Sequence, residues 1–167
     1  MDIDKLGRQI VESCRTRGWA GIETGISRPV PEVVGEKIRL WYLLYRSQIR
    51  PPYQMLYEPT AAVAVDYATG QILEHRELPT STPPKVLGRY PHAAAAAVPS
   101  DRWQAVWDEL FSLYPDVIAA FAGQPVARQR EKIARFAELW ELTVPPFMTG
   151  FYRMLNPAFF EWLERPR

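Results

Sequence analysis

The sequence lacks the features that form disulfides, secretion signals or membrane-spanning helices. It holds a single cysteine among 167 residues, Cys14, so no disulfide can form within the chain. It contains no run of about 18 apolar residues, the length that a membrane-spanning helix requires. The acidic start, Met1-Asp2-Ile3-Asp4, lacks the apolar core of a secretion signal. These absences predict a cytoplasmic protein that does not enter the membrane.

An excess of charge of one sign is missing as well. Lysine and arginine number 20 and aspartate and glutamate 19, which leaves a formal net charge of +1. Nucleic-acid-binding proteins usually carry a marked basic excess, because contacts with phosphates supply most of their affinity. The charge balance therefore argues against a nucleic acid as partner.

Histidine is scarce, which limits the metal sites that the chain can build. The two histidines are His75 and His92, and a zinc site needs three or four converging histidine, cysteine or carboxylate ligands. The one cluster of such residues is Glu74-His75-Arg76-Glu77. On a strand His75 and Glu77 would share a face, whereas Glu74 would point away. We therefore predict no metal and no cofactor.

Recognisable catalytic motifs are absent too. There is no glycine-rich phosphate loop and no nucleophile elbow. Cys14 lies on the apolar face of a predicted helix, where a small core residue is expected. An acid–base site would have to combine His75, Glu58 and Asp66 with nearby tyrosines. Because the sequence around Asp66 is typical of a turn, we predict binding rather than catalysis.

The first half of the chain has the pattern of one helix followed by strands. Apolar residues at helical spacing predict an amphipathic helix over 2–17, with Asp2 as its N-cap. Residues 18–35 are rich in glycine and proline and predict a loop. Asp66-Tyr67-Ala68-Thr69-Gly70 predicts the turn of a hairpin. The predicted strands cover residues 36–46, 54–57, 60–66 and 71–77.

The second half has an irregular segment followed by helices. Prolines and an alanine run over residues 79–99 predict a long loop. Ser100 is the predicted N-cap of the first helix, and Pro115 is predicted to bend or restart it. Pro145-Pro146 is predicted to end the second helix, and Asn156-Pro157 to cap and begin the last. The predicted helices cover residues 100–122, 125–142 and 158–164.

Strands that come together in the sequence, followed by helices, predict an α+β domain with an antiparallel sheet. We expect an N-terminal helix packed on a 3–4-stranded antiparallel meander, followed by a C-terminal group of 3–4 helices. This order resembles cystatin-like and NTF2-like topology, and a fold does not by itself imply a function. The prediction is a single domain over 1–167, with helix plus sheet in 1–78, the loop in 79–99 and the helical part in 100–167.

Aromatic side chains are abundant, with 6 Trp, 8 Tyr and 7 Phe. Many occupy inward helical positions, but a surplus lies beside turns and in the last 21 residues (147–167). Phe151 and Tyr152 are adjacent and cannot face the same way on a helix. The tail therefore either closes the core of its own domain or meets a ligand or another chain. The candidate binding residues are Arg50, Tyr53, Tyr57, Tyr67, His75, Tyr90, Phe151 and Tyr152.

Two hypotheses about function follow from this surplus. The first is a non-catalytic accessory, adaptor or immunity-type bacterial protein that docks a protein partner through exposed aromatic and arginine residues. The second is a small-molecule-binding protein or acid–base enzyme with a cavity between the sheet and the C-terminal helices, lined by Tyr53, Tyr57, Tyr90 and His75. Self-association through the C-terminal helices is compatible with both. Exposed, clustered aromatics would favour docking, whereas aromatics turned inward around a void would favour a ligand.

Overall fold

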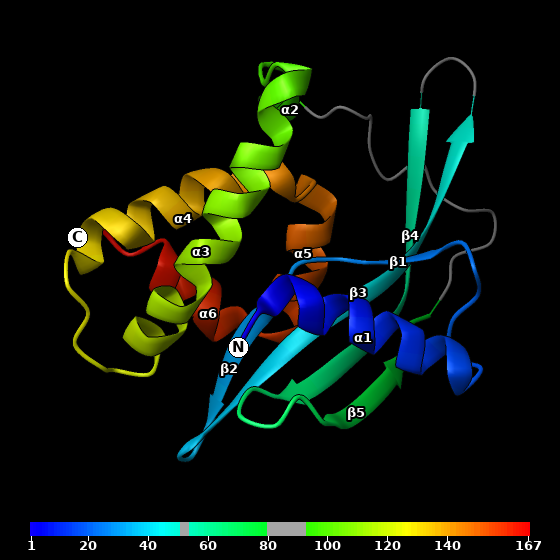
Figure 1. Ribbon diagram of the computed structural model, residues 1–167, viewed down its shortest axis with the longest axis horizontal. Coiled ribbons are helices and arrows are strands. Elements are labelled where there is room, and N and C mark those ends of the chain that lie inside the picture. The colour runs from blue at the N-terminus through cyan, green and yellow to red at the C-terminus, as the bar shows by residue number, and fades with distance from the viewer. Residues whose placement is uncertain (51–53, 80–92) are drawn as a thin grey trace.

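The computed structural model describes residues 1–50, 54–79 and 93–167. Five antiparallel strands form one sheet in these ranges, and helices precede and follow it (Figure 1). The α+β class is therefore confirmed, although the sheet has five strands and not three or four. In chain order the elements are α1 (Ile3–Thr16), β1 (Thr24–Ile26), β2 (Val30–Val34), β3 (Lys37–Arg50), β4 (Gln54–Asp66), β5 (Ile72–Glu77), α2 (Ala93–Ala96), α3 (Trp103–Phe121), α4 (Gln129–Thr143), α5 (Pro146–Leu155) and α6 (Pro157–Leu163).

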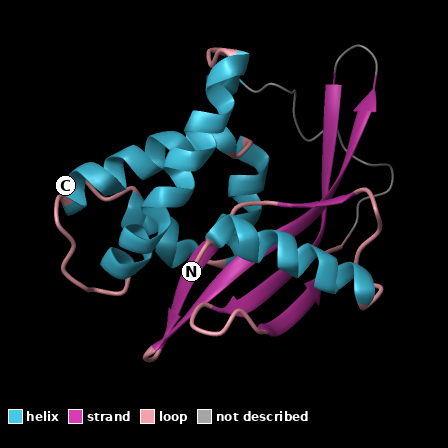
Figure 2. Cartoon of the chain, viewed as in Figure 1, coloured by secondary structure: helices cyan, strands magenta, loops and turns pink. Residues whose placement is uncertain are grey.

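Strand β3 is the centre of the architecture. It pairs with β4 along one side and with both β1 and β2 along the other, and β5 extends the sheet beyond β4. Every residue from Leu40 to Leu44 is buried, so the middle of β3 is covered on both faces. Figure 2 shows α1 lying across the strands and the later helices gathered to one side of it.

Helix α1 forms as its sequence pattern predicts. The Asp2 side chain accepts a hydrogen bond from the Lys5 backbone N–H (2.9 Å), which satisfies one of the free donors of the first turn. Gly18 follows the helix with a φ of 74°, a left-handed conformation that glycine adopts at little cost. The buried face consists of Ile3, Leu6, Gly7, Ile10, Val11 and Cys14.

The predicted loop over 18–35 is wrong, because this segment contains β1 and β2. Both strands pair antiparallel with β3, Ile26 opposite Leu44 and Val30 opposite Trp41. Pro31 is tolerated in β2 because proline, which has no N–H to donate, is accommodated on strands at the edge of a sheet. The glycines and prolines that suggested a loop mark the ends of two short strands.

Strands β3 and β4 form one long hairpin. The prediction ended the first strand at residue 46 and split the second at Glu58-Pro59, but β4 runs unbroken from Gln54 to Asp66. Pro59 fits inside β4 because it lies opposite Tyr45, where the register of the pair shifts. The predicted break at 51–53 lies outside the described residues.

The turn from β4 to β5 confirms its sequence signature. One carboxylate oxygen of Asp66 accepts hydrogen bonds from the N–H groups of Ala68 (2.8 Å) and Thr69 (2.9 Å). Gly70 has a φ of 73°, which a side chain would disfavour. These hydrogen bonds to the backbone lower the pKa of Asp66 below its ordinary value.

The helical half departs from prediction at its boundaries. Ser100 is not an N-cap but the first residue of a 3₁₀-helical turn that leads into α3. Pro115 lies inside α3, which continues past it because Val117 and Ile118 are buried in the core. Helix α4 begins at Gln129 and not at residue 125.

Helix α5 was not predicted, since it follows directly on the proline pair that ends α4. Pro146 occupies its first turn, where the missing N–H would have had no helical partner. Of the predicted loop over 79–99, residues 80–92 lie outside the described part, and α2 forms one short turn within the alanine run.

A tyrosine from α5 closes the gap that separates β1 from β2. The Leu43 carbonyl of β3 accepts from the Ser27 N–H (2.9 Å), but the Leu43 N–H meets no strand and donates to the Tyr152 hydroxyl (3.1 Å). That hydroxyl in turn donates to the Arg28 carbonyl (2.5 Å). Tyr152 therefore replaces a missing strand partner and ties α5 to the sheet.

Two further side chains from the helical half hold the same segment. The Tyr114 hydroxyl of α3 donates to the Pro29 carbonyl (2.8 Å), and the Asn156 amide donates to the Pro31 carbonyl (2.5 Å). Asn156, predicted to cap α6, makes no capping hydrogen bond with its side chain. Side chains from the helices thus satisfy three carbonyls at the edge of the sheet.

Replacing Tyr152 by phenylalanine tests the importance of this bridge. Tyr152→Phe is expected to lower the free energy of unfolding by about 2–4 kcal/mol, because two buried backbone groups lose their partner. Tyr67→Phe is the matched control: Tyr67 is half-buried, and its hydroxyl makes no hydrogen bond within the described residues, so a change below about 0.5 kcal/mol is expected. Urea unfolding measures both variants. Equal losses of unfolding free energy in the two variants would contradict a stabilising role for the Tyr152 bridge.

Candidate functional site

Arg28 lies in the bend between β1 and β2 and faces two neighbouring cavities. We name them by one lining residue each. The Tyr57 cavity has a volume of about 490 Å³ and the Asp108 cavity about 380 Å³. Both are lined by Arg28, Tyr45 and Trp107, so these three side chains lie at the boundary between the two cavities.

The guanidinium of Arg28 rests on an aromatic ring. Its central carbon lies 3.4 Å from the ring centroid of Trp107, a cation–π contact between the bend and α3. Its Nε is buried and has no hydrogen-bond partner within the described residues. An unsatisfied buried donor on a cation is costly, more so than on a neutral group.

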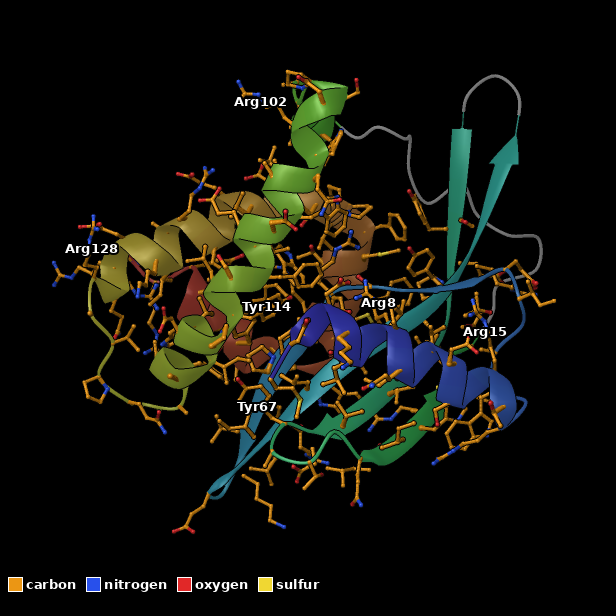
Figure 3. All side chains as sticks on the ribbon, viewed as in Figure 1. Arg8, Arg15, Tyr67, Arg102, Tyr114 and Arg128 are labelled. Atoms are coloured by element: carbon orange, nitrogen blue, oxygen red, sulfur yellow. The ribbon has the colours of Figure 1, made fainter. Side chains whose placement is uncertain are left out.

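Arg28 differs from the other half-buried arginines in having no carboxylate. Those other arginines each pair with a glutamate: Arg15 with Glu12, Arg39 with Glu32 and Arg46 with Glu58. Arg28 forms no ion pair with any residue that the structure describes, and residues 51–53 and 80–92 contain no Asp or Glu. Arg102 and Arg128, by contrast, lie at the outer edge of the helical half, in solvent (Figure 3).

Burial shapes the electrostatics around this cation. It lowers the pKa of Arg28 below its ordinary value, and the nearby tyrosines, Tyr45 first, offset part of that effect. Guanidinium nevertheless stays protonated at neutral pH. Burial raises the pKa of Tyr114 and of Tyr152, so both remain neutral hydroxyl donors. The site therefore carries one fixed positive charge in a poorly hydrated setting.

The walls of the Tyr57 cavity are mostly apolar and come from both halves of the fold. The ring of Tyr57 packs edge-on against Tyr45 (centroids 5.6 Å apart) and is tilted against Phe147 of α5 (5.4 Å). The Thr143 hydroxyl donates to the Leu139 carbonyl and is thus already satisfied. The described lining comprises Arg28, Tyr45, Ser47, Tyr57, Ala95, Trp103, Trp107, Leu142, Thr143, Pro145 and Met148.

The Asp108 cavity lies on the side of α1 and is more polar. Asp4 and Asp108 line it, and each already has a partner: Asp4 pairs with Arg8 (2.5 Å), and Asp108 accepts from Gln104 (2.8 Å). Neither carboxylate forms an ion pair with Arg28 among the described contacts. This space therefore combines both signs of charge, unlike the Tyr57 cavity.

The structure brings few of the sequence-predicted site residues together. Tyr57 is buried and lines the cavity between the sheet and the helices. Arg50 ends β3, and its side chain is outside the described part, as are Tyr53 and Tyr90.

The remaining candidates serve other contacts. His75 stacks on Trp19 (centroids 4.2 Å apart), away from Tyr57. Tyr67 is half-buried, and burial raises its pKa. Phe151 packs against the core, and Tyr152 is fully buried in the bridge to Arg28. The aromatic tail thus closes the core of its own domain.

Sequence reasoning missed Arg28, Tyr45 and Trp107. Arg28 falls in the predicted loop over 18–35, Tyr45 in the predicted strand over 36–46, and Trp107 in the predicted helix over 100–122, none of which was a candidate site. Arg28 is flanked by Ser27 and Pro29, and no motif or spacing marks that arginine. Its position depends on a gap between two strands that the pattern did not predict.

Searches for recognisable sites and relatives give negative results. Within residues 1–50, 54–79 and 93–167, no group of three or more His, Cys, Asp or Glu side chains is arranged to hold a metal ion. Among the helices described, none has both the length and the apolar character needed to cross a membrane. No family model, curated protein or solved structure matches the chain. The cystatin-like or NTF2-like topology stays a prediction.

The position of Tyr45 depends on the glycine across from it. A Cβ added at Gly25 would lie 2.8 Å from Cζ of Tyr45, so Gly25→Ala must push the ring away. We expect a loss of about 1–3 kcal/mol in the free energy of unfolding. In a Tyr45→Ala background the same change should cost almost nothing, because the ring is gone. Guanidinium unfolding of all four proteins gives the coupling, and additive losses would refute the contact.

Proposed function

We propose that the chain is a binding protein for a small organic anion, held at Arg28 where the two cavities meet. The observation that carries the proposal is a half-buried guanidinium that has, within the described residues, no partner for its Nε and no carboxylate in ion-pair contact. Carboxylates and phosphates fit a guanidinium with two parallel hydrogen bonds. Such a ligand would satisfy the donors that the protein leaves open.

Energetics favour an anionic ligand over a structural role for Arg28. Full burial of an unpaired charge costs several kcal/mol, and the half-buried guanidinium of Arg28 bears part of that cost. The cation–π contact with Trp107 stabilises the folded protein by only about 0.5–2 kcal/mol. A side chain kept at a net cost in the free protein is typical of a binding site, where stability is exchanged for function.

The distribution of aromatic side chains also supports a ligand. Among the described aromatic residues Trp19 alone is exposed, at 36% of its surface, and the others are buried or half-buried. Tyr45, Tyr57, Trp103 and Trp107 surround a cavity of about 490 Å³, within the size range typical of small-molecule sites. Aromatics turned inward around a void favour the small-molecule hypothesis over docking.

The other hypotheses drawn from the sequence stay predictions. Docking of a protein partner, an immunity-type or adaptor role, self-association through the C-terminal helices and a cytoplasmic location gain no specific support from the geometry. The acid–base alternative relies on His75, which lies in a different cavity from Tyr57 and Arg28. Binding without catalysis is therefore the function proposed.

Replacing Arg28 by methionine separates binding from stability. Arg28→Met should raise the free energy of unfolding of the free protein by about 1–2 kcal/mol, because the removal of a half-buried, unpaired charge outweighs the loss of the cation–π contact. The same change should abolish the thermal stabilisation that small organic acids give to the unmodified protein. Urea unfolding and thermal melts with a panel of organic acids measure the two effects.

Arg46→Met is the matched control, because it breaks an ion pair with Glu58 (3.1 Å) away from both cavities. It should leave ligand stabilisation intact and should not raise stability. If Arg28→Met destabilises the free protein and organic acids stabilise it as before, Arg28 is structural and the proposal fails.

A further inference from the structure

We infer that the ligand is an amphipathic carboxylate, with its carboxylate on Arg28 and its apolar body in the Tyr57 cavity. This inference rests on the proposed function and names the ligand class and its orientation. It is argued from the charges, the lining and the volume of the two cavities that meet at Arg28.

The balance of charge selects one cavity for the body of the ligand. The described lining of the Tyr57 cavity contains a single charged side chain, that of Arg28. The Asp108 cavity adds two carboxylates, Asp4 and Asp108, against Arg8 and Arg28. An anionic ligand would be repelled by those carboxylates, because their interaction strengthens where water is displaced. The Tyr57 cavity therefore suits the anion better.

The single positive charge selects the head group. A carboxylate carries one negative charge, which one guanidinium matches. A phosphate monoester carries about −1.5 to −2 at neutral pH, and one arginine would leave part of that charge buried without compensation. The described lining of the Tyr57 cavity contains no lysine or second arginine that could compensate the remaining negative charge.

The lining selects the body of the ligand. Trp103 and Leu142 come from α3 and α4, and Met148 from α5, and they surround the space next to the Tyr57 ring. Met148 is buried, so its side chain belongs to a fixed wall. Burial of an apolar group against such walls gives roughly 25 cal/mol for each Å² removed from water. A short polar acid such as acetate would leave this surface unused.

Isothermal titration of the full chain with matched probes tests the inference. The amphipathic acids are indole-3-acetate, 4-phenylbutyrate and octanoate. Indole-3-acetamide keeps the indole body without the charge, acetate keeps the head without the body, and inorganic phosphate offers the competing anion. At least one amphipathic acid should bind. Indole-3-acetamide should bind roughly 10- to 100-fold more weakly than indole-3-acetate, because it loses a hydrogen bond between charged groups. The Arg28→Gln variant should bind the amphipathic acid more weakly than the unmodified protein by the same factor.

Two substitutions of exposed lining residues test the orientation. Ser47→Phe places a ring at the Tyr57 cavity, and Gln104→Phe places the same ring at the Asp108 cavity. Both positions are exposed, so the fold should tolerate the change, and thermal melts check it. Ser47→Phe should weaken binding of the amphipathic acid at least tenfold, while Gln104→Phe leaves it within about twofold.

The other outcomes are decisive in the opposite direction. Loss of binding in Gln104→Phe but not in Ser47→Phe would overturn the orientation. Equal binding of indole-3-acetamide, or Arg28-dependent binding of phosphate tighter than that of every amphipathic acid, would overturn the carboxylate class. Phosphate binding at Arg28 would point to an organic phosphate as the ligand and would leave the proposed function standing. If none of the anions binds the unmodified protein, the inference and the proposed function both fail.

Discussion

The hydroxyl group of Tyr152 joins the two halves of this protein. It accepts from the Leu43 N–H of the central strand and donates to the Arg28 carbonyl at the edge of the sheet. Without it, the gap between β1 and β2 would leave two buried backbone groups unpaired, which the interior of a protein rarely tolerates. Helix α5 is therefore attached to the sheet by directional hydrogen bonds as well as by apolar packing. Tyr114 attaches α3 in the same way, through the Pro29 carbonyl.

This attachment also explains why Arg28 lies where it does. Its carbonyl is held by Tyr152 and the next carbonyl, of Pro29, by Tyr114. The backbone is thereby fixed, and the guanidinium is left against Trp107 at the meeting point of two cavities. A positive charge held on a rigid frame, with no carboxylate partner in the described part of the chain, is preorganised for an external anion. The binding proposal follows from this placement.

The sequence predicts the features that depend on local signals. The helix capped by Asp2 and the turn built on Asp66 form as expected, because their hydrogen bonds span only a few residues. β1 and β2 were missed because short strands rich in proline and glycine exist only through pairing with β3. Asn156 has the sequence context of a cap but bonds the Pro31 carbonyl 125 residues away. Of the candidate site residues, Tyr57 lines the cavity at Arg28, whereas Arg28 itself has no local signature.

The most direct test follows the Nε–H group of Arg28 by nitrogen-15 NMR. Within the described residues, Arg28, Arg39 and Arg46 each have a buried Nε without a hydrogen-bond partner. Arg39 and Arg46 form ion pairs with glutamates, whereas Arg28 forms none there. Titration with whichever of indole-3-acetate, 4-phenylbutyrate and octanoate binds most tightly should shift the Arg28 signal and leave those of Arg39 and Arg46 in place. The Arg28→Lys variant assigns the signal. A titration that shifts another arginine, or none, would contradict a ligand site at Arg28.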